Sequence, residues 1–224
     1  MSNMKIIGFV GLPGSGKGEA SQIARQMGLA VVVMGDVIRL EAARQGLEPT
    51  DQNLGRIGNA LRAAEGPDAV ARRTFEMALS TEQDIVVVDG LRSREEADFF
   101  RAHAEEFYLV EVCAPAQARL KWLAARGRPD DPGRGQAKDG GHMISEGTIA
   151  DNNADIKIVS SCRDPDHQAA AALEQRECRE MGWGMCDAMK IADMKLRNDG
   201  SLQDLREDVK RLLDLFLAGA TSLR

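Results

Sequence analysis

The feature that most constrains the fold is a run of glycines between an apolar segment and an amphipathic one. Residues 5–10 (KIIGFV) have the length and composition of a buried strand, and residues 11–18 (GLPGSGKG) follow at once. Over residues 19–27 the apolar side chains recur at helical spacing. A glycine-rich turn between a strand and a helix directs several backbone N–H groups to one point, next to the positive end of the helix dipole. The chain is therefore expected to begin with a strand, an anion-binding turn and a helix.

The glycine-rich run matches the P-loop pattern in both spacing and context. In that pattern the backbone surrounds a phosphate and a lysine reaches the outer phosphates of a nucleoside triphosphate. Lys17 holds the lysine position. An ordinary glycine-rich turn is the alternative, but such a turn requires neither the lysine nor both flanking elements. The residues expected to bind ATP here are Gly11, Leu12, Pro13, Gly14, Ser15, Gly16, Lys17, Gly18 and Glu19.

Position 18 departs from the general pattern, because it is Gly where many P-loops carry a Ser or Thr that binds Mg²⁺. Glu19 follows, and its carboxylate has two alternative roles. It orders Mg²⁺ through water, or it faces solvent at a helix N-terminus, where negative charge is favourable. We favour the second, so a magnesium ion would depend on a carboxylate elsewhere in the chain.

The rest of the chain alternates continuous apolar runs with helical patterns. Such runs are typical of strands in a parallel sheet that helices cover on both faces. We therefore predict an α/β, three-layer P-loop NTPase fold with a five-stranded, mostly parallel sheet. Ligands of such sheets bind beyond the carboxyl ends of the strands. The further strands are expected at 30–34, 84–89, 107–112 and 194–197, and helices at 37–44, 54–64, 69–79, 118–126 and 202–216.

Asp36 and Arg39 follow the second apolar run and lie three residues apart, on one face of a helical turn. A guanidinium suits bidentate capture of a phosphate, so Arg39 is a candidate for binding the phosphate of an acceptor. Asp36 is a candidate for orienting or deprotonating an acceptor hydroxyl. The alternative is a local surface ion pair of little energetic consequence.

Asp89 closes the third apolar run, and Arg92 follows three residues later. A carboxylate at the end of a strand beside a P-loop can order Mg²⁺ and its water molecules, so Asp89 is the candidate metal ligand, acting through water. Alternatively, Asp89 caps the helix that follows. Arg92 is the favoured candidate for a phosphate ligand, and Arg94 is the second candidate.

The whole chain, 1–224, is expected to form one P-loop domain with two excursions. Residues 37–80 would form a helical excursion that binds the acceptor, and residues 126–180 a lid. Within the lid, residues 133–168 are rich in glycine and polar side chains and show little periodicity. We interpret that stretch as an inserted, mobile segment, with a disordered loop as the alternative.

Arginines near both ends of the lid region are candidates for neutralising charge on the transferring phosphoryl group. Arg126 and Arg128 lie near its start, where the alternative is a helix C-terminus that carries cations. Arg176 and Arg179 lie one helical turn apart near its end. The two later arginines either face the site or pair with the glutamates beside them on a solvated helix face. Trp183 either turns its ring toward a substrate or packs in the core.

Composition limits the partners and the compartment. The net charge is −6, which argues against nucleic acid as a general partner. The apolar runs are too short for a membrane span, and the N-terminus shows no signal-peptide pattern. Four widely spaced cysteines fit reduced thiols better than a disulfide framework. We therefore expect a cytoplasmic protein without a membrane partner, either a monomer or a homodimer.

Taken together, the motifs resemble an archaeal family of P-loop proteins that are like nucleotide kinases and are described as ATPases. That family is related to dephospho-CoA kinases and to nucleoside monophosphate kinases of the adenylate type. The match covers most of the chain and fails at about 133–168. The segments that carry it are 11–19 (GLPGSGKGE), 34–39 (MGDVIR), 59–62 (NALR), 89–92 (DGLR), 126–131 (RGRPDD), 176–185 (RECREMGWGM) and 198–201 (NDGS).

The resemblance implies ATP and Mg²⁺ as cofactors and a small phosphorylated molecule as acceptor. It implies that Asn198 and Gly200 lie near the adenine ring. The residues that it implies for the acceptor are Asp36, Arg39, Arg62 and Arg92. Those that it implies for catalysis are Lys17, Asp36, Arg92, Arg128 and Arg176.

Two functions fit these motifs. The first is an ATP-dependent phosphotransferase whose catalysis rests on positioning and charge neutralisation. The second is an ATP-binding switch or slow ATPase that regulates a protein or RNA partner, with the glycine-rich insertion as its contact surface. The sequence does not identify the acceptor.

Overall fold

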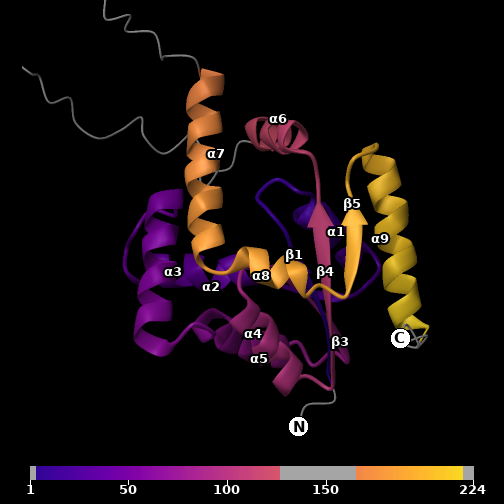
Figure 1. Ribbon diagram of the computed structural model, residues 1–224. Coiled ribbons are helices and arrows are strands. Elements are labelled where there is room, and N and C mark those ends of the chain that lie inside the picture. The colour runs from indigo at the N-terminus through magenta and orange to yellow at the C-terminus, as the bar shows by residue number, and fades with distance from the viewer. Residues whose placement is uncertain (1–3, 127–164, 219–224) are drawn as a thin grey trace, which may run out of the picture.

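The chain forms one five-stranded sheet with helices on both faces (Figure 1). The computed structural model describes residues 4–126 and 165–218. All neighbouring strands are parallel, and their order is β2-β3-β1-β4-β5. The predicted α/β fold with a five-stranded sheet is confirmed. The strands are β1 (Lys5–Val10), β2 (Ala30–Val33), β3 (Ile85–Leu91), β4 (Glu106–Cys113) and β5 (Met194–Arg197).

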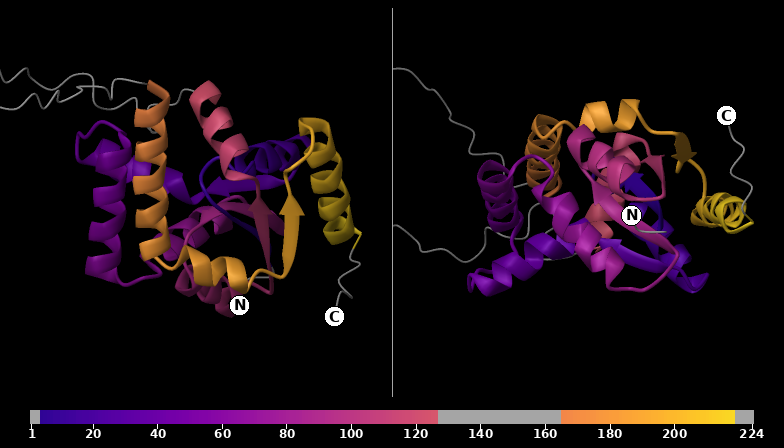
Figure 2. Two further views of the ribbon diagram at one scale, coloured as in Figure 1. Left: turned by 45° about the horizontal axis from the view of Figure 1, so that its top comes forward. Right: turned by 90° about the horizontal axis from the view of Figure 1, so that it is seen from below.

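Helices complete the two outer layers, and the further views in Figure 2 show them around the sheet. Helices α1 and α9 pack on one face, while α2, α4, α5 and α8 cover the other. The helices are α1 (Lys17–Gln26), α2 (Met34–Arg44), α3 (Asp51–Glu65), α4 (Ala69–Leu79), α5 (Arg94–His103), α6 (Ala116–Arg126), α7 (Pro165–Gly182), α8 (Met185–Lys190) and α9 (Leu202–Leu217).

The central strand β1 shows why the apolar runs are continuous. Successive side chains of a strand point to opposite faces of the sheet. Ile6 and Val10 belong to the core under α2, α4 and α5, whereas Ile7 and Phe9 belong to the core under α1 and α9. Because both faces are covered, both sets of positions must be apolar.

Three helical features differ from the sequence expectation. Helix α5 was not among the expected helices, although the alternative role of Asp89 as a cap implied a helix after it. One of the buried residues of α5, Glu96, is a carboxylate that interrupts the apolar periodicity. The short helix α8 was not expected either. Helix α7 begins at Pro165, so residues 165–168 are helical although they were assigned to the inserted segment. Proline is well tolerated in the first turn of a helix, and the alanines at 169–172 are strong helix formers.

The carboxyl edge of the sheet is where the candidate residues are expected. In Figure 1, α6 and α7 lie beyond the strand arrowheads, and α7 runs beside α3. Arg128 and residues 133–164, which the sequence assigned to the lid, lie outside the described residues.

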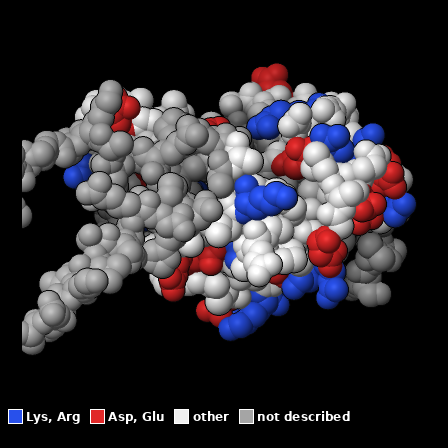
Figure 3. Space-filling view, turned by 90° about the horizontal axis from the view of Figure 1, so that it is seen from above, with Lys and Arg blue, Asp and Glu red and all other residues white. Residues whose placement is uncertain are grey.

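No helix in the described part of the chain is both long and apolar enough to cross a membrane. On the face in Figure 3, basic and acidic side chains are interspersed.

Candidate active site

The P-loop lies between β1 and α1, and three of its glycines adopt torsions that other residues rarely take. The φ angle is +147° at Gly11, +78° at Gly14 and +110° at Gly16. A side chain at Gly16 would also place its Cβ 2.5 Å from the Asn198 Nδ2 atom. The tight turn and the close approach of the C-terminal loop therefore both require glycine at position 16.

Asn198 supports the P-loop from the loop that follows β5. Its side-chain amide donates a hydrogen bond to the Ser15 carbonyl oxygen at 3.0 Å, and the residue is 5% exposed. The P-loop and the loop after β5, which are far apart in the sequence, are therefore in contact at this turn. Asn198 and Gly200 both line the pocket that contains the P-loop, although the Asn198 amide nitrogen is engaged with the loop itself.

Lys17 begins α1 and folds back over the loop. Its Nζ atom donates to the carbonyl oxygens of Gly11 at 2.6 Å and Leu12 at 3.0 Å. Burial lowers the pKa of this amine to about 8, although the carboxylates of Asp89 and Glu180 act to raise it. A partly desolvated ammonium beside the loop amides is well placed to attract the outer phosphates of a nucleotide.

We expect nucleotide binding at about pH 9 to take up close to one proton. With a pKa of about 8, Lys17 is mostly neutral there in the free protein, and the phosphate charge of a bound nucleotide restores the ammonium. For the same reason, affinity should fall as the pH rises above about 8. Calorimetry in two buffers of different ionisation enthalpy measures the uptake. Equal heats in both buffers at about pH 9 would contradict this account of Lys17.

Asp89 lines the same pocket as Lys17 and the P-loop glycines, and it is 8% exposed. The alternative interpretation of Asp89 as a helix cap is wrong. Ser93 caps α5 instead, because its Oγ atom accepts the Glu96 backbone N–H at 3.2 Å. The Asp89 carboxylate therefore lines the pocket that contains the P-loop and does not cap a helix.

The donor set suits a magnesium ion that arrives with the nucleotide. Within residues 4–126 and 165–218, no group of three His, Cys, Asp or Glu side chains could hold a metal ion by itself. Mg²⁺ commonly binds through one or two carboxylates, with water and substrate phosphates completing the shell. Asp89 fits that role. Glu19 forms an ion pair with Arg206 of α9 at 2.8 Å and also lines the P-loop pocket, so it does not simply face solvent as the favoured interpretation expected.

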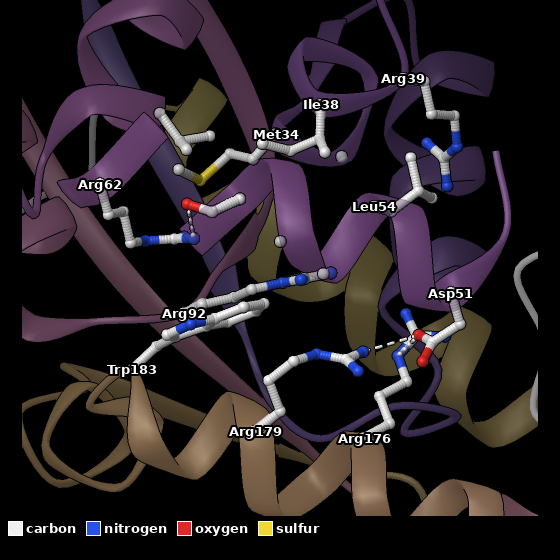
Figure 4. A pocket seen from close by; sticks show the side chains of 15 residues that line it. Met34, Ile38, Arg39, Asp51, Leu54, Arg62, Arg92, Arg176, Arg179 and Trp183 are labelled. Atoms are coloured by element: carbon white, nitrogen blue, oxygen red, sulfur yellow. Dashed lines mark hydrogen bonds and ion pairs between the residues drawn. The ribbon is translucent and has the colours of Figure 1, made fainter. Parts of the chain in front are cut away.

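A second pocket, which we call the arginine pocket, lies between α2, α3 and α7 (Figure 4). One carboxylate, Asp51, lines it together with five arginines. Such an excess of guanidinium groups favours an anionic ligand. The five arginines are Arg39, Arg62, Arg92, Arg176 and Arg179.

The P-loop pocket and the arginine pocket meet. Arg39, Arg92 and Arg176 line both of them, together with Gly35 and Gly90. Three arginines that are far apart in the sequence therefore lie where the two pockets meet, and we call this place the junction. Arg39 comes from α2, Arg92 follows β3 and Arg176 comes from α7. Of the two alternatives for Arg176 and Arg179, facing the site is correct, although Arg176 also pairs with Glu180.

Glu180 is a functional candidate that the sequence analysis did not identify. This glutamate was considered only as a partner of the arginines on a solvated helix face. It is 2% exposed and lines the P-loop pocket. Its carboxylate lies 3.1 Å from Arg176 Nε and 3.4 Å from Arg92 Nη2. Burial alone would raise the pKa of this carboxyl, but the two guanidinium groups hold it below its usual value. The spacing of four residues predicts that Arg176 and Glu180 pair on one helix face, but it does not predict that the pair is buried.

Two further arginine pairs involve residues of the arginine pocket. Arg62 forms an ion pair with the fully buried Glu96 at 2.6 Å. Arg39 pairs with Asp36 at 2.7 Å, and the Asp36 side chain is half exposed. Asp36 is not among the described residues that line either pocket, so its contact with the site passes through Arg39.

Known proteins resemble the chain over most of its length. A family model described as an AAA domain matches residues 10–134. A UPF0200 protein of Methanothrix thermoacetophila is 45% identical over 211 residues, which cover 94% of this chain and 97% of that protein. The chain belongs to the UPF0200 family. A UPF0200 protein of Methanosarcina acetivorans is 37% identical, with 96% of each chain covered. The expected relation to an archaeal P-loop family is confirmed.

A solved structure supports the fold of this UPF0200 protein. The crystal structure of TT1252 from Thermus thermophilus aligns with a TM-score of 0.52 and covers 95% of this chain and 98% of that chain. The two sequences are 19% identical, so the likeness concerns the fold alone. The likeness supports the α/β fold of the chain, in which the P-loop connects β1 to α1.

Proposed function

We propose that this UPF0200 protein is an ATP-dependent phosphotransferase that acts on a small phosphorylated acceptor. The observation that carries the proposal is the junction of two pockets. One contains the P-loop and the other is lined by arginines, and they share Arg39, Arg92 and Arg176. A phosphoryl group passing from one pocket to the other would cross this junction.

On the donor side, the P-loop amides and Lys17 bind the outer phosphates of ATP. Asp89 orients the water molecules around Mg²⁺, and the ion supplies charge neutralisation between the phosphates when it is bound. The pocket has apolar walls from Trp122, Leu123 and Leu202, and these suit the flat base of a nucleotide. The chain itself contributes positioning and electrostatics, which dominate catalysis of phosphoryl transfer.

On the acceptor side, Arg39, Arg92 and Arg176 neutralise the negative charge that spreads over the phosphoryl oxygens. Glu180 holds the Arg92 and Arg176 guanidinium groups at the junction. Asp36 orients Arg39, and an acceptor that presents a phosphate oxygen needs no general base. Arg128 stays a predicted lid residue outside the described chain.

The test is an acceptor screen with ATP labelled in its γ-phosphate. The panel holds nucleoside monophosphates, dephospho-CoA and other phosphorylated metabolites. Label in a small-molecule product supports the proposal. Label released only as inorganic phosphate, and only when a protein or RNA is added, would replace it with the ATP-dependent switch.

The variant Arg39→Ala is expected to raise the KM for the acceptor by about 10- to 100-fold, which corresponds to the loss of a charge-assisted contact of ~1.5–3 kcal/mol. Affinity for ATP should change less than about twofold, because Lys17 and the loop amides hold the donor. Steady-state kinetics with each substrate varied in turn measures both effects.

The matched control is Arg44→Ala on the same helix, since Arg44 pairs with Glu41 away from both pockets and its side chain is 75% exposed. Arg44→Ala should leave both the KM for the acceptor and the affinity for ATP unchanged. Equal losses of acceptor and ATP affinity in Arg39→Ala would instead assign Arg39 to the fold.

A further inference from the structure

Trp183 lies at the turn between α7 and α8, and its indole ring lines the arginine pocket. The chain turns here because Gly184 adopts a φ of +97°, a left-handed conformation that favours glycine. The indole Nε1–H donates a hydrogen bond to Asn59 Oδ1 of α3 at 2.5 Å. The ring is therefore held from two sides, by the turn that carries it and by α3.

Three guanidinium groups lie against this one ring (Figure 4). The distance from the Cζ atom to the ring centroid is 4.5 Å for Arg62, 5.3 Å for Arg92 and 5.7 Å for Arg179. All three distances fall within the range of about 6 Å for cation–π contacts. Because Arg62 belongs to α3 and Arg179 to α7, while Arg92 follows β3, the ring joins cations from three parts of the chain.

Each of these three arginines also pairs with a carboxylate. The pairs are Arg62 with Glu96 at 2.6 Å, Arg92 with Glu180 at 3.4 Å and Arg179 with Asp51 at 2.7 Å. A carboxylate engages the N–H donors in the plane of the guanidinium group, which are the donors that a phosphate needs. An aromatic ring instead attracts the cation through its flat face, so it orients the group without taking those donors.

The ring also offsets a repulsion among the arginines. Burial lowers the pKa of the Arg92 guanidinium, and the charges of Arg176 and Arg62 lower it further, whereas the charge of Glu180 raises it. The negative face of an aromatic ring favours a cation beside it. Trp183 therefore stabilises Arg92 at a place where burial and two neighbouring cations disfavour its charge.

Arg92 is the member of this trio that lies at the junction. It lines both pockets, whereas Arg62 and Arg179 line the arginine pocket and not the P-loop pocket. Trp183 likewise lines the arginine pocket and not the P-loop pocket. The ring thus contacts an arginine of the junction from the side away from the P-loop.

We propose that Trp183 is a positioning residue that orients the Arg92 guanidinium toward a phosphate at the junction. Arg62 and Arg179 are held beside Arg92 by the same ring. The proposal rests on the proposed function for its view of that phosphate as part of the acceptor. It assigns a role in acceptor affinity to a side chain that acts through Arg92.

The first experiment uses Trp183 as its own reporter. The chain has two tryptophans, so Trp122→Phe leaves Trp183 as the only source of tryptophan emission. Inorganic phosphate is the probe, and we expect a saturable change in emission because an anion bound to Arg92 alters the charge next to the ring. The double variant Trp122→Phe and Arg92→Gln should show no saturable change. Emission that phosphate leaves unaltered in Trp122→Phe would overturn the proposal.

The second experiment changes the ring and measures phosphate binding by calorimetry without ATP. The Lys17→Ala chain is the parent, because the P-loop is then a weaker second site for phosphate. Trp183→Leu removes the aromatic face and should lower the affinity for phosphate about 10-fold. Trp183→Phe keeps a weaker aromatic face and should lose no more than about 3-fold.

Phe99→Leu on α5 is the matched control for Trp183→Leu. It replaces another aromatic ring by leucine, one that stacks on His103 with a centroid distance of 4.0 Å outside both pockets. The affinity for phosphate should stay that of the parent. Equal affinities in Trp183→Leu and the parent would overturn the proposal, as would equal losses in Trp183→Leu and Trp183→Phe.

A purely structural role of Trp183 predicts a different result. With Lys17 in place, Trp183→Leu should change the affinity for ATP by less than about twofold, because the ring does not line the P-loop pocket. Losses of ATP and phosphate affinity of the same size would assign Trp183 to the fold and overturn the proposal.

The phosphate titrations need neither ATP nor turnover, so the two proposals fail separately. A loss of phosphate affinity in Trp183→Leu without any labelled product in the acceptor screen would sink the transferase and leave the role of Trp183 standing. A labelled product whose acceptor KM is the same in Trp183→Leu as in the unmodified chain would do the reverse.

Discussion

Lys17→Ala is expected to lower the affinity for ATP by about 10- to 100-fold and to lower the rate of turnover still more. The substitution removes a cation that sits over the loop amides, and charge-assisted contacts of this kind contribute about 1.5–3 kcal/mol to binding. The effect on turnover is larger, about 100- to 1,000-fold, because the same cation stabilises charge in the transition state. Equilibrium binding of ATP and single-turnover kinetics measure the two effects.

The matched control for this prediction is Lys5→Ala. Lys5 begins β1 and forms an ion pair with Glu106 at 2.8 Å, away from both pockets. Its removal should leave ATP binding unchanged. The melting temperature of Lys17→Ala should stay close to that of the parent, because burial of the amine disfavours its charged form in the folded protein. Full activity in Lys17→Ala would remove the donor site from this account.

Glu96→Ala is expected to lower the free energy of unfolding by about 3–5 kcal/mol, the range for breaking a buried ion pair from one side. Glu96 is fully buried and accepts hydrogen bonds from Arg62 Nη2 at 2.6 Å and from the Arg92 backbone N–H at 2.8 Å. Its loss leaves the Arg62 cation, which is 13% exposed, without its carboxylate. Urea denaturation with an unchanged m-value measures the effect.

Asp98→Ala on the same helix is the control for Glu96→Ala. Asp98 pairs with Arg94 at 3.4 Å, and both side chains are more than half exposed. Exposed ion pairs contribute about 0–1 kcal/mol, so this variant should unfold close to the parent. If Glu96→Ala also stayed within about 1 kcal/mol of the parent, the buried pair would not hold Arg62 and Arg92 in place.

The P-loop and the sheet were predictable because their signals are local. The spacing of glycines and lysine in residues 11–18 predicts the turn, and unbroken apolar runs such as 85–88 predict strands covered on both faces. The predicted five-stranded parallel sheet followed from these runs. Helix α5 was missing from the predicted helices because Glu96 occupies a buried position where the apolar periodicity of a helix requires an apolar residue.

The arginine pocket was less predictable because it is assembled from distant segments. Arg39, Arg92 and Arg176 were each proposed singly, but no periodicity relates α2, the end of β3 and α7. Glu180 looked like half of a solvated i, i+4 pair, since a sequence does not show which face of a helix is buried. Likewise, the approach of Arg179 to Gly55 depends on how α7 packs on α3.

Titration of the purified full chain with ATP and magnesium in a calorimeter tests the central claim most directly. The account predicts saturable heat with one site per chain and a dissociation constant between about 1 µM and 1 mM, the usual range for enzyme substrates. Lys17→Ala should suppress that heat, and Lys5→Ala should preserve it. If no purine triphosphate produced heat under these conditions, the loop at residues 11–18 would not be a nucleotide site and the account would be contradicted.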